Sequence, residues 1–114
     1  MKSAGVAAED LALEFLESRG LKLITRNYRC RFGEIDLVLQ DGDTTVFAEV
    51  RLRKSENFGG AAASVTAAKQ QKLIATAQHY LGARRDLPAC RFDVIALDQL
   101  DRARVEWIKD AFGT

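Results

Sequence analysis

Two apolar, strand-like segments joined by a short polar turn constrain this chain more than any other feature. The segments run from Glu34 to Gln40 and from Thr44 to Arg53, and the intervening Asp41–Asp43 reads Asp-Gly-Asp. An Asp-Gly turn between two such segments predicts a tight β-hairpin. We therefore expect an antiparallel pair of strands near the middle of the chain.

Each of these two segments carries an acid among apolar residues. Side chains alternate along a strand, so Asp36 shares a face with Glu34 and Val38, whereas the opposite face holds Ile35, Leu37 and Leu39. A two-residue turn at Gly42–Asp43 places Asp36 directly opposite Glu49. A turn one residue earlier leaves the two acids diagonal on one face, and a three-residue loop with a bulge would separate them.

Two carboxylates on one face need a neutralising partner, because like charges directly opposite each other destabilise a sheet. We expect a divalent cation or an arginine beside Asp36 and Glu49. An acid, a second acid and then a cation on adjacent strands is a pattern that would suit a divalent metal bound next to a phosphate. The alternative is a network of ion pairs without further function, formed with Arg51, Arg53 or Arg29.

The remaining elements predict one α/β domain covering residues 1–114. Hydrophobic periodicity and helix-ending signals indicate two helices, and apolar runs indicate three more strands. The expected elements besides the hairpin are a helix at about Ala4–Arg19 ended by Gly20, a strand at Leu21–Arg31, a loop at Lys54–Ala63, a helix at Thr66–Leu81, and strands at Arg91–Leu97 and Val105–Ile108. This α-β-β-β-α-β-β order predicts a central mixed sheet flanked by helices.

Further charged residues are candidates for the same site. Glu9 lies on the packing stripe of the first helix, from which it could reach the sheet, or it is an acid that complements the helix dipole. Several cations could contact phosphates, or they form an ordinary solvated surface. These cations are Arg29, Arg31, Arg53, Lys54, Lys69 and Lys72.

Composition sets limits on the class of protein. The formal net charge of +1 does not by itself indicate nucleic-acid binding, and the sequence contains neither a membrane-length apolar run nor a signal peptide. We expect a cytoplasmic protein that does not contact a membrane. Cys30 and Cys90 lack zinc-site spacing and are expected as free core thiols. His79 is expected on the solvent side, and Asp93 is expected to pair with an arginine.

The whole pattern resembles a known family. The blocks lie in the family's order and spacing over nearly the whole chain, and read GVAAEDLALEFL, RNYRCRFGEIDLV, VFAEVRLR, GGAAASVTAAKQQKL, CRFDVIAL and VEWIKDAF. They resemble the YraN-like family of small bacterial proteins. That family is similar to a branch of the restriction-endonuclease-like, or PD-(D/E)xK, superfamily close to archaeal Holliday-junction resolvases. The resemblance therefore implies a restriction-endonuclease-like fold.

The resemblance also implies roles for individual residues. Asp36 and Glu49 match the two motif acids, and Glu9 matches a helix acid that assists metal binding. Mg²⁺, or Mn²⁺ as a substitute, would be held by Asp36, Glu49 and the carbonyl of Val50. The implied activity is metal-dependent hydrolysis of phosphodiester bonds in DNA, at branched or otherwise distorted structures. Resolvase-like proteins often act as dimers, so a homodimer is a further expectation.

Arg51 departs from the superfamily pattern, which usually has lysine at this position. Arginine remains protonated at any working pH, so Arg51 cannot act as a base, although it can bind a phosphate through two hydrogen bonds. Lys54, Lys69 or a substrate phosphate would then handle the proton. The departure leaves open a non-catalytic DNA- or protein-binding module that keeps the nuclease fold, and a scaffold whose acids form ion pairs is a third reading.

Overall fold

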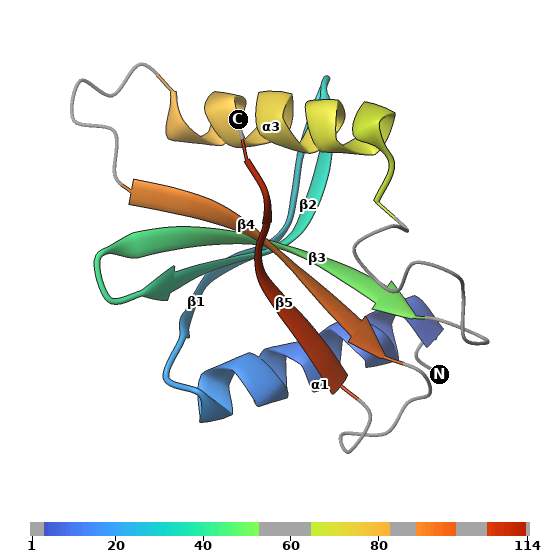
Figure 1. Ribbon diagram of the computed structural model, residues 1–114, viewed down its shortest axis with the longest axis vertical. Coiled ribbons are helices and arrows are strands. Elements are labelled where there is room, and N and C mark those ends of the chain that lie inside the picture. The colour runs from blue at the N-terminus through green and yellow to red at the C-terminus, as the bar shows by residue number, and fades with distance from the viewer. Residues whose placement is uncertain (1–3, 53–64, 83–88, 98–104, 114) are drawn as a thin grey trace.

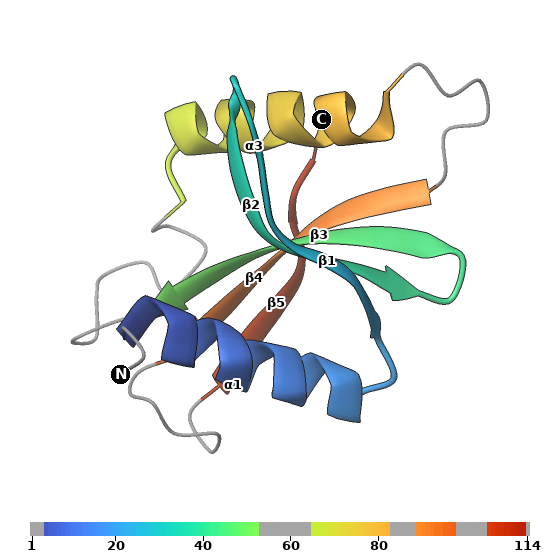
Figure 2. The ribbon, with the colours of Figure 1, turned by 180° about the vertical axis from the view of Figure 1, so that it is seen from behind.

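Five strands form one sheet in the part of the chain that the structure, a computed structural model, describes: residues 4–52, 65–82, 89–97 and 105–113. One helix packs on each face of the sheet (Figure 1, and from behind in Figure 2). The elements are α1 (Ala4–Ser18), β1 (Lys22–Cys30), β2 (Gly33–Asp41), β3 (Thr44–Leu52), α3 (Ala67–Leu81), β4 (Ala89–Leu97) and β5 (Val105–Phe112). The predicted α/β class and α-β-β-β-α-β-β order are confirmed, and the arrangement is consistent with a restriction-endonuclease-like fold.

The sheet is mixed, as expected. Its strands lie in the order β1-β2-β3-β4-β5, and β3 and β4 pair in parallel while the other neighbours are antiparallel. Parallel neighbours require a long crossover connection, and α3 lies in the chain between β3 and β4. The crossover therefore places α3 over one face of the central strands.

Alternation along the strands divides the core into two clusters. Phe47 and Val38 pack with Leu73, Ala77 and other residues on the α3 side of the sheet. Their sequence neighbours belong to the cluster on the α1 side, which contains Ala12, Leu16, Leu37, Leu39, Val46 and Ala48. Both faces of β2 and β3 are thus covered, and an acid on these strands is surrounded by apolar side chains.

The hairpin has the register that the two-residue turn predicts. Asp41 pairs with Thr44, and the pairing continues to Leu37 opposite Ala48. Gly42 has a φ of 58°, a left-handed conformation that glycine adopts without strain. Beyond Leu37 the strands separate: the beginning of β2 lies beside α3, whereas the end of β3 runs toward the start of α1 (Figure 1). Asp36 and Glu49 lie at this divergence.

Some sequence predictions need correction. Ile35 packs with Val38 on the α3 side rather than with Leu37, because the regular alternation of β2 is lost where it leaves β3. Strand β5 extends to Phe112 instead of ending at Ile108, since it pairs with β4 as far as Phe92.

The two cysteines are free but are not core residues. Cys90 is exposed near the start of β4, and Cys30 is half-buried on the edge strand β1. Apolar neighbours in the sequence do not bury a residue when its strand end projects past the packed layers. Among the described residues, no helix has the length and apolar character needed to cross a membrane.

Candidate functional site

Asp36 and Glu49 meet at the divergence of β2 and β3. Oδ2 of Asp36 accepts a hydrogen bond from the backbone N–H of Val50 at 2.8 Å, so the side chain replaces a backbone partner where the ladder ends. The carboxyl group of Glu49 lies within hydrogen-bonding reach of Asp36, and its side chain is 12% exposed. The structure therefore brings together the two acids that the hairpin pattern places on one face.

This proximity changes the acidity of both carboxyl groups. Burial raises the pKa of Asp36 to about 6, and the charges of Glu9 and Glu34 act in the same direction, while the Val50 hydrogen bond opposes them. Burial and the charge of Asp36 raise the pKa of Glu49 to about 7, against the opposing effect of Arg51 and Lys69. Near neutral pH the pair therefore tends to retain a shared proton.

Arg51 only partly neutralises these acids. Its Nη2 lies 3.7 Å from Oε1 of Glu49, beyond hydrogen-bonding distance. Nε and Nη2 are buried and have no hydrogen-bond partner among the described residues. A buried guanidinium N–H without an acceptor is unfavourable. Because these nitrogens are buried, an anion could meet them only if the Arg51 side chain, which is 22% exposed, changed its position.

A pocket of about 290 Å³ opens beside the acid pair. It is lined by Asp36, Glu49, Gly33, Glu34, Lys69, Lys72 and Leu73. Thr66 caps the start of α3 by accepting a hydrogen bond from the N–H of Lys69. Lys69 and Lys72 are three residues apart and hence on one side of the helix. The helix therefore presents two cations to a pocket whose opposite wall carries two acids.

Glu9 lies behind this pocket rather than in its lining. Its Oε1 is 3.3 Å from Arg26 on β1, and the same guanidinium binds Asp10 at 2.9 Å. The side-chain amide of Asn27 satisfies its neighbours when its nitrogen faces the two glutamates. In this orientation the nitrogen donates to Glu34 at 3.0 Å and to Glu9 at 3.3 Å. Glu9 is close enough for its charge to raise the pKa of Asp36, but Arg26 and Asn27 of β1 hold its carboxylate.

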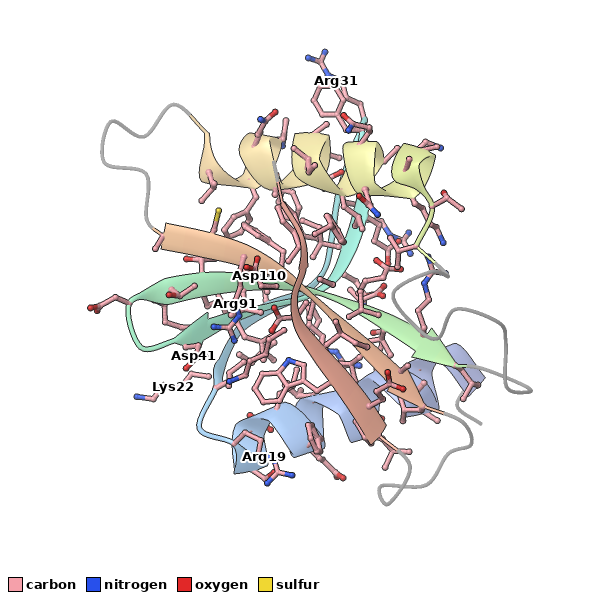
Figure 3. The ribbon with its side chains drawn as sticks, in the orientation of Figure 1. Arg19, Lys22, Arg31, Asp41, Arg91 and Asp110 are labelled. Carbon is pink, nitrogen blue, oxygen red and sulfur yellow. The ribbon has the colours of Figure 1, made fainter. Side chains whose placement is uncertain are left out.

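The other predicted cations differ in position. Arg29 is 74% exposed and pairs with Glu34 at 2.8 Å. Arg31 is exposed at the tip of the β1–β2 hairpin, where its guanidinium lies over the ring of Phe32 (Figure 3). Arg53 and Lys54 lie outside the described residues. Of the six cations predicted from sequence, Lys69 and Lys72 line the pocket.

The sequence reasoning missed the residues that support Glu9. Asn27 has a φ of 54° inside β1, opposite the point at which β2 leaves β3. Asparagine is uncommon within strands and tolerates left-handed backbone, so its place in the middle of a strand was the available signal. Arg26 and Asp10 had no comparable signal, since their contact depends on how α1 packs against β1.

A second buried acid, Asp93, lies on β4. Its fully buried carboxylate accepts hydrogen bonds from Nε of Arg91 at 3.0 Å, Nε1 of Trp107 at 2.9 Å and the N–H of Asp110 at 2.9 Å. Arg91 also binds Asp41 at 2.8 Å, and these residues lie near one another in Figure 3. The predicted pairing of Asp93 with an arginine is confirmed. His79 is exposed as predicted, and its Nδ1 hydrogen bonds with Tyr28.

The acid pair fits a small divalent cation. No group of three or more His, Cys, Asp or Glu side chains within the described ranges is arranged to hold a metal. Mg²⁺, however, commonly uses one or two carboxylates and keeps several waters. The N–H and C=O of a residue in an extended antiparallel strand point to the same side, so the carbonyl of Val50 faces Asp36 as its amide does. Asp36, Glu49 and this carbonyl therefore form a suitable set of oxygen donors.

Fold and site together define a small α/β protein with a buried carboxyl pair in a cation-lined pocket. Residues 8–97 match the model of the uncharacterised protein family UPF0102, and the chain belongs to this family. A UPF0102 protein of Methylobacillus flagellatus is 57% identical over 99% of both chains. A UPF0102 protein of Ralstonia nicotianae is 57% identical over 97% of this chain and 87% of its own length. The YraN-like family resemblance is thereby confirmed.

Proposed function

We propose that this protein is a Mg²⁺-dependent nuclease that hydrolyses phosphodiester bonds in DNA, with branched or repair-intermediate structures as its substrates. In this proposal it belongs to the restriction-endonuclease-like superfamily and is similar to archaeal Holliday-junction resolvases. The observation that carries the proposal is the Asp36–Glu49 pair. Its carboxyl groups are buried, mutually repulsive and open to a pocket that Lys69 and Lys72 line.

The chemistry follows from the distribution of charge. Asp36, Glu49 and the Val50 carbonyl would hold Mg²⁺, and the shared proton would leave when the metal binds. Bound Mg²⁺ would polarise the scissile phosphate and lower the pKa of an attacking water. In this proposal Arg51, which lies beside Glu49 and is 22% exposed, supplies guanidinium donors to the phosphate once its side chain turns toward the pocket.

Lys69 is the proposed group that handles the proton. It lines the pocket, and its charge partly offsets the rise in the pKa of Glu49 that burial and the charge of Asp36 cause. Unlike arginine, lysine can lose a proton when its surroundings disfavour its charge. In this proposal Lys69 orients the attacking water, and Arg51 stabilises the negative charge that develops on the phosphate.

The proposal is tested by incubating the purified protein with linear, nicked, single-stranded and four-way-junction DNA in Mg²⁺ or Mn²⁺. We expect Asp36→Asn to abolish metal-dependent cleavage, since it removes one of the two carboxylates. Asp43→Asn is the matched control, because Asp43 is exposed in the β2–β3 turn, away from the pocket. Equal cleavage by Asp36→Asn and the parent would reject the nuclease.

Arg51 supports a second candidate, a non-catalytic module that binds DNA through its phosphates. Its guanidinium lies near Glu49, where the superfamily usually has lysine. This candidate predicts DNA binding that weakens steeply with salt, without metal-dependent turnover. Creation of cleavage by Arg51→Lys would indicate a nuclease site that has lost its base. Absence of binding at low salt would reject the module.

A further inference from the structure

The tip of the β1–β2 hairpin carries an exposed aromatic ring beside the candidate site. Phe32 is 40% exposed in the turn that joins the two strands. The guanidinium carbon of Arg31 lies 4.8 Å from the centre of its ring, and the His79 ring centre is 6.1 Å away. In Figure 3 the tip with Arg31 projects past α3. A large apolar ring on a protruding turn is a contact surface rather than a part of the core.

This ring belongs to a row of aromatic contacts that reaches the core. His79 hydrogen bonds with Tyr28, whose ring meets Tyr80 edge-on at 5.1 Å. Tyr80 in turn contacts the buried Phe47, with ring centres 5.9 Å apart. Rings held in this way lose little further freedom on binding a ligand. The hairpin tip is therefore a firmly supported surface.

The tip is also attached to the wall of the pocket. Gly33 follows Phe32 directly and lines the pocket together with Lys72. Gly33 has a φ of 153°, and a Cβ added there would lie 3.1 Å from Oγ1 of Thr76 and 3.8 Å from Cβ of Lys72. The absence of a side chain at this position allows the hairpin to approach α3 closely. Phe32 does not line the pocket itself, but it directly precedes Gly33 in the pocket wall.

We propose that Phe32, with Arg31 and His79 beside it, stacks against an unpaired base of DNA whose backbone reaches the Asp36–Glu49 pocket. The inference rests on the proposed function and names the feature of the substrate that is recognised, a nucleotide outside the duplex stack. Charge favours a nucleic acid as the occupant: Arg31 lies over the ring, and Lys72, which is close to Gly33, lines the pocket with the acids. A duplex without a break hides the faces of its bases, so the ring discriminates against it.

The test is binding in EDTA, which removes the metal and prevents hydrolysis. The probes are a duplex with one unpaired 2-aminopurine, whose fluorescence falls when the base stacks on an aromatic ring, and the same duplex fully paired. We expect the parent to prefer the unpaired probe and to quench it. Phe32→Ala should weaken binding of that probe by about 5- to 100-fold, the range expected for loss of one stacked base. Binding of the paired duplex should not change.

Two further variants complete the design. Phe32→Trp retains an aromatic face and should keep both the affinity and the quenching. Ile24→Ala is the matched control, since Ile24 is a similarly exposed apolar residue, 46% exposed, near the end of β1 that lies away from the hairpin tip. The proposal that Phe32 stacks on an unpaired base is wrong if Phe32→Ala binds the unpaired probe as tightly as the parent does. It is also wrong if Phe32→Ala weakens both probes equally, or if Ile24→Ala has the same effect.

Failure of the nuclease proposal would be recognised separately. Normal quenching by the parent together with the absence of metal-dependent cleavage would retain the stacking surface and reject catalysis. Cleavage that requires Asp36 but shows no preference for unpaired bases, with Phe32→Ala equal to the parent, would retain the nuclease and reject the stacking surface.

Discussion

Two acid sites, one fully buried and one half-buried, lie on opposite faces of the same sheet and differ in how their charges are satisfied. Asp93 receives hydrogen bonds from Arg91, Trp107 and a backbone amide. Asp36 accepts a hydrogen bond from the Val50 amide, while the nearest guanidinium nitrogen of Arg51 is 3.7 Å from the Glu49 carboxylate. The two sites are neighbours in the sheet, since Asp93 pairs with Ala48, which precedes Glu49. The strand partner of Asp93 is thus one residue away from Glu49, yet the carboxylate of Asp93 has its hydrogen-bond donors and that of Glu49 does not.

The difference teaches what each site is for. Asp93 ties β4 to β5 and, through Arg91, to Asp41 at the β2–β3 turn. Its donors are supplied by the fold, so it needs no ligand. The Asp36–Glu49 pair has two raised pKa values and an open pocket, a combination that costs stability in the absence of a ligand. The satisfied site serves the fold, and the unsatisfied site is the one at which we propose that a cation binds.

Removing the satisfied acid should have the largest effect on stability. Asp93→Ala leaves Nε of Arg91, the Trp107 N–H and the Asp110 amide without their acceptor, although Asp41 still pairs with the Arg91 guanidinium. Loss of one partner from a buried charged network costs about 3–5 kcal/mol. Urea unfolding of the parent and variant measures the difference. A loss below about 1 kcal/mol would show that water replaces the carboxylate, and would remove the contrast between the two sites.

The unsatisfied pair should make stability depend on pH in a defined direction. Both carboxyl groups have a higher pKa in the folded protein than in the unfolded chain, so folding favours their protonated forms. This contribution is complete below about pH 4 and is lost as the pH rises through about 7. A tenfold change in proton affinity corresponds to about 1.4 kcal/mol, so ionisation at pH 8 should cost about 3 kcal/mol for either group alone and at most about 6 kcal/mol for the coupled pair.

The double variant Asp36→Asn/Glu49→Gln tests that assignment. We expect it to flatten the profile of unfolding free energy against pH between about 4 and 8. Asp43→Asn, which removes an exposed acid, should leave the profile unchanged. If the double variant retains the full slope, other groups cause it and the pair is better satisfied than its geometry indicates.

Binding of a divalent metal should offset much of the free-energy cost of holding the ionised Asp36–Glu49 pair in the folded protein. Mg²⁺ or Mn²⁺ at about a hundred times its dissociation constant should stabilise the folded protein by about 2.7 kcal/mol at neutral pH. Glu49→Gln should lose this stabilisation, because it removes one of the two carboxylates. Thermal unfolding with and without metal measures the effect. An unchanged melting temperature in the parent would favour the scaffold reading, in which the acids form only an ion-pair network.

Sequence reasoning predicted the parts of the site that follow from local pattern. The two-residue turn at Gly42–Asp43, one of the two alternatives, gives the observed register, and this register brings Asp36 to Glu49. Helix periodicity correctly brought Lys69 and Lys72 to the edge of the buried stripe. The separation of β2 from β3 was not predictable in this way, because it depends on how α3 and α1 pack on opposite faces. The change of Ile35 to the α3 side and the engagement of Glu9 by Arg26 both follow from that packing.

The smallest effect concerns Asn27, which supports the unsatisfied site from β1. It combines a left-handed backbone with hydrogen bonds to Glu9 and Glu34. Asn27→Gly can still adopt the left-handed backbone conformation but loses the side-chain hydrogen bonds, so we expect the free energy of unfolding to fall by about 1 kcal/mol. Asn27→Ala loses the same bonds and adds backbone strain of about 1 kcal/mol, and should be the less stable of the two. Equal unfolding free energies of the two variants would mean that the φ of 54° does not constrain this position. The backbone that supports the Asp36–Glu49 pair would then be more adaptable than the backbone around Asp93.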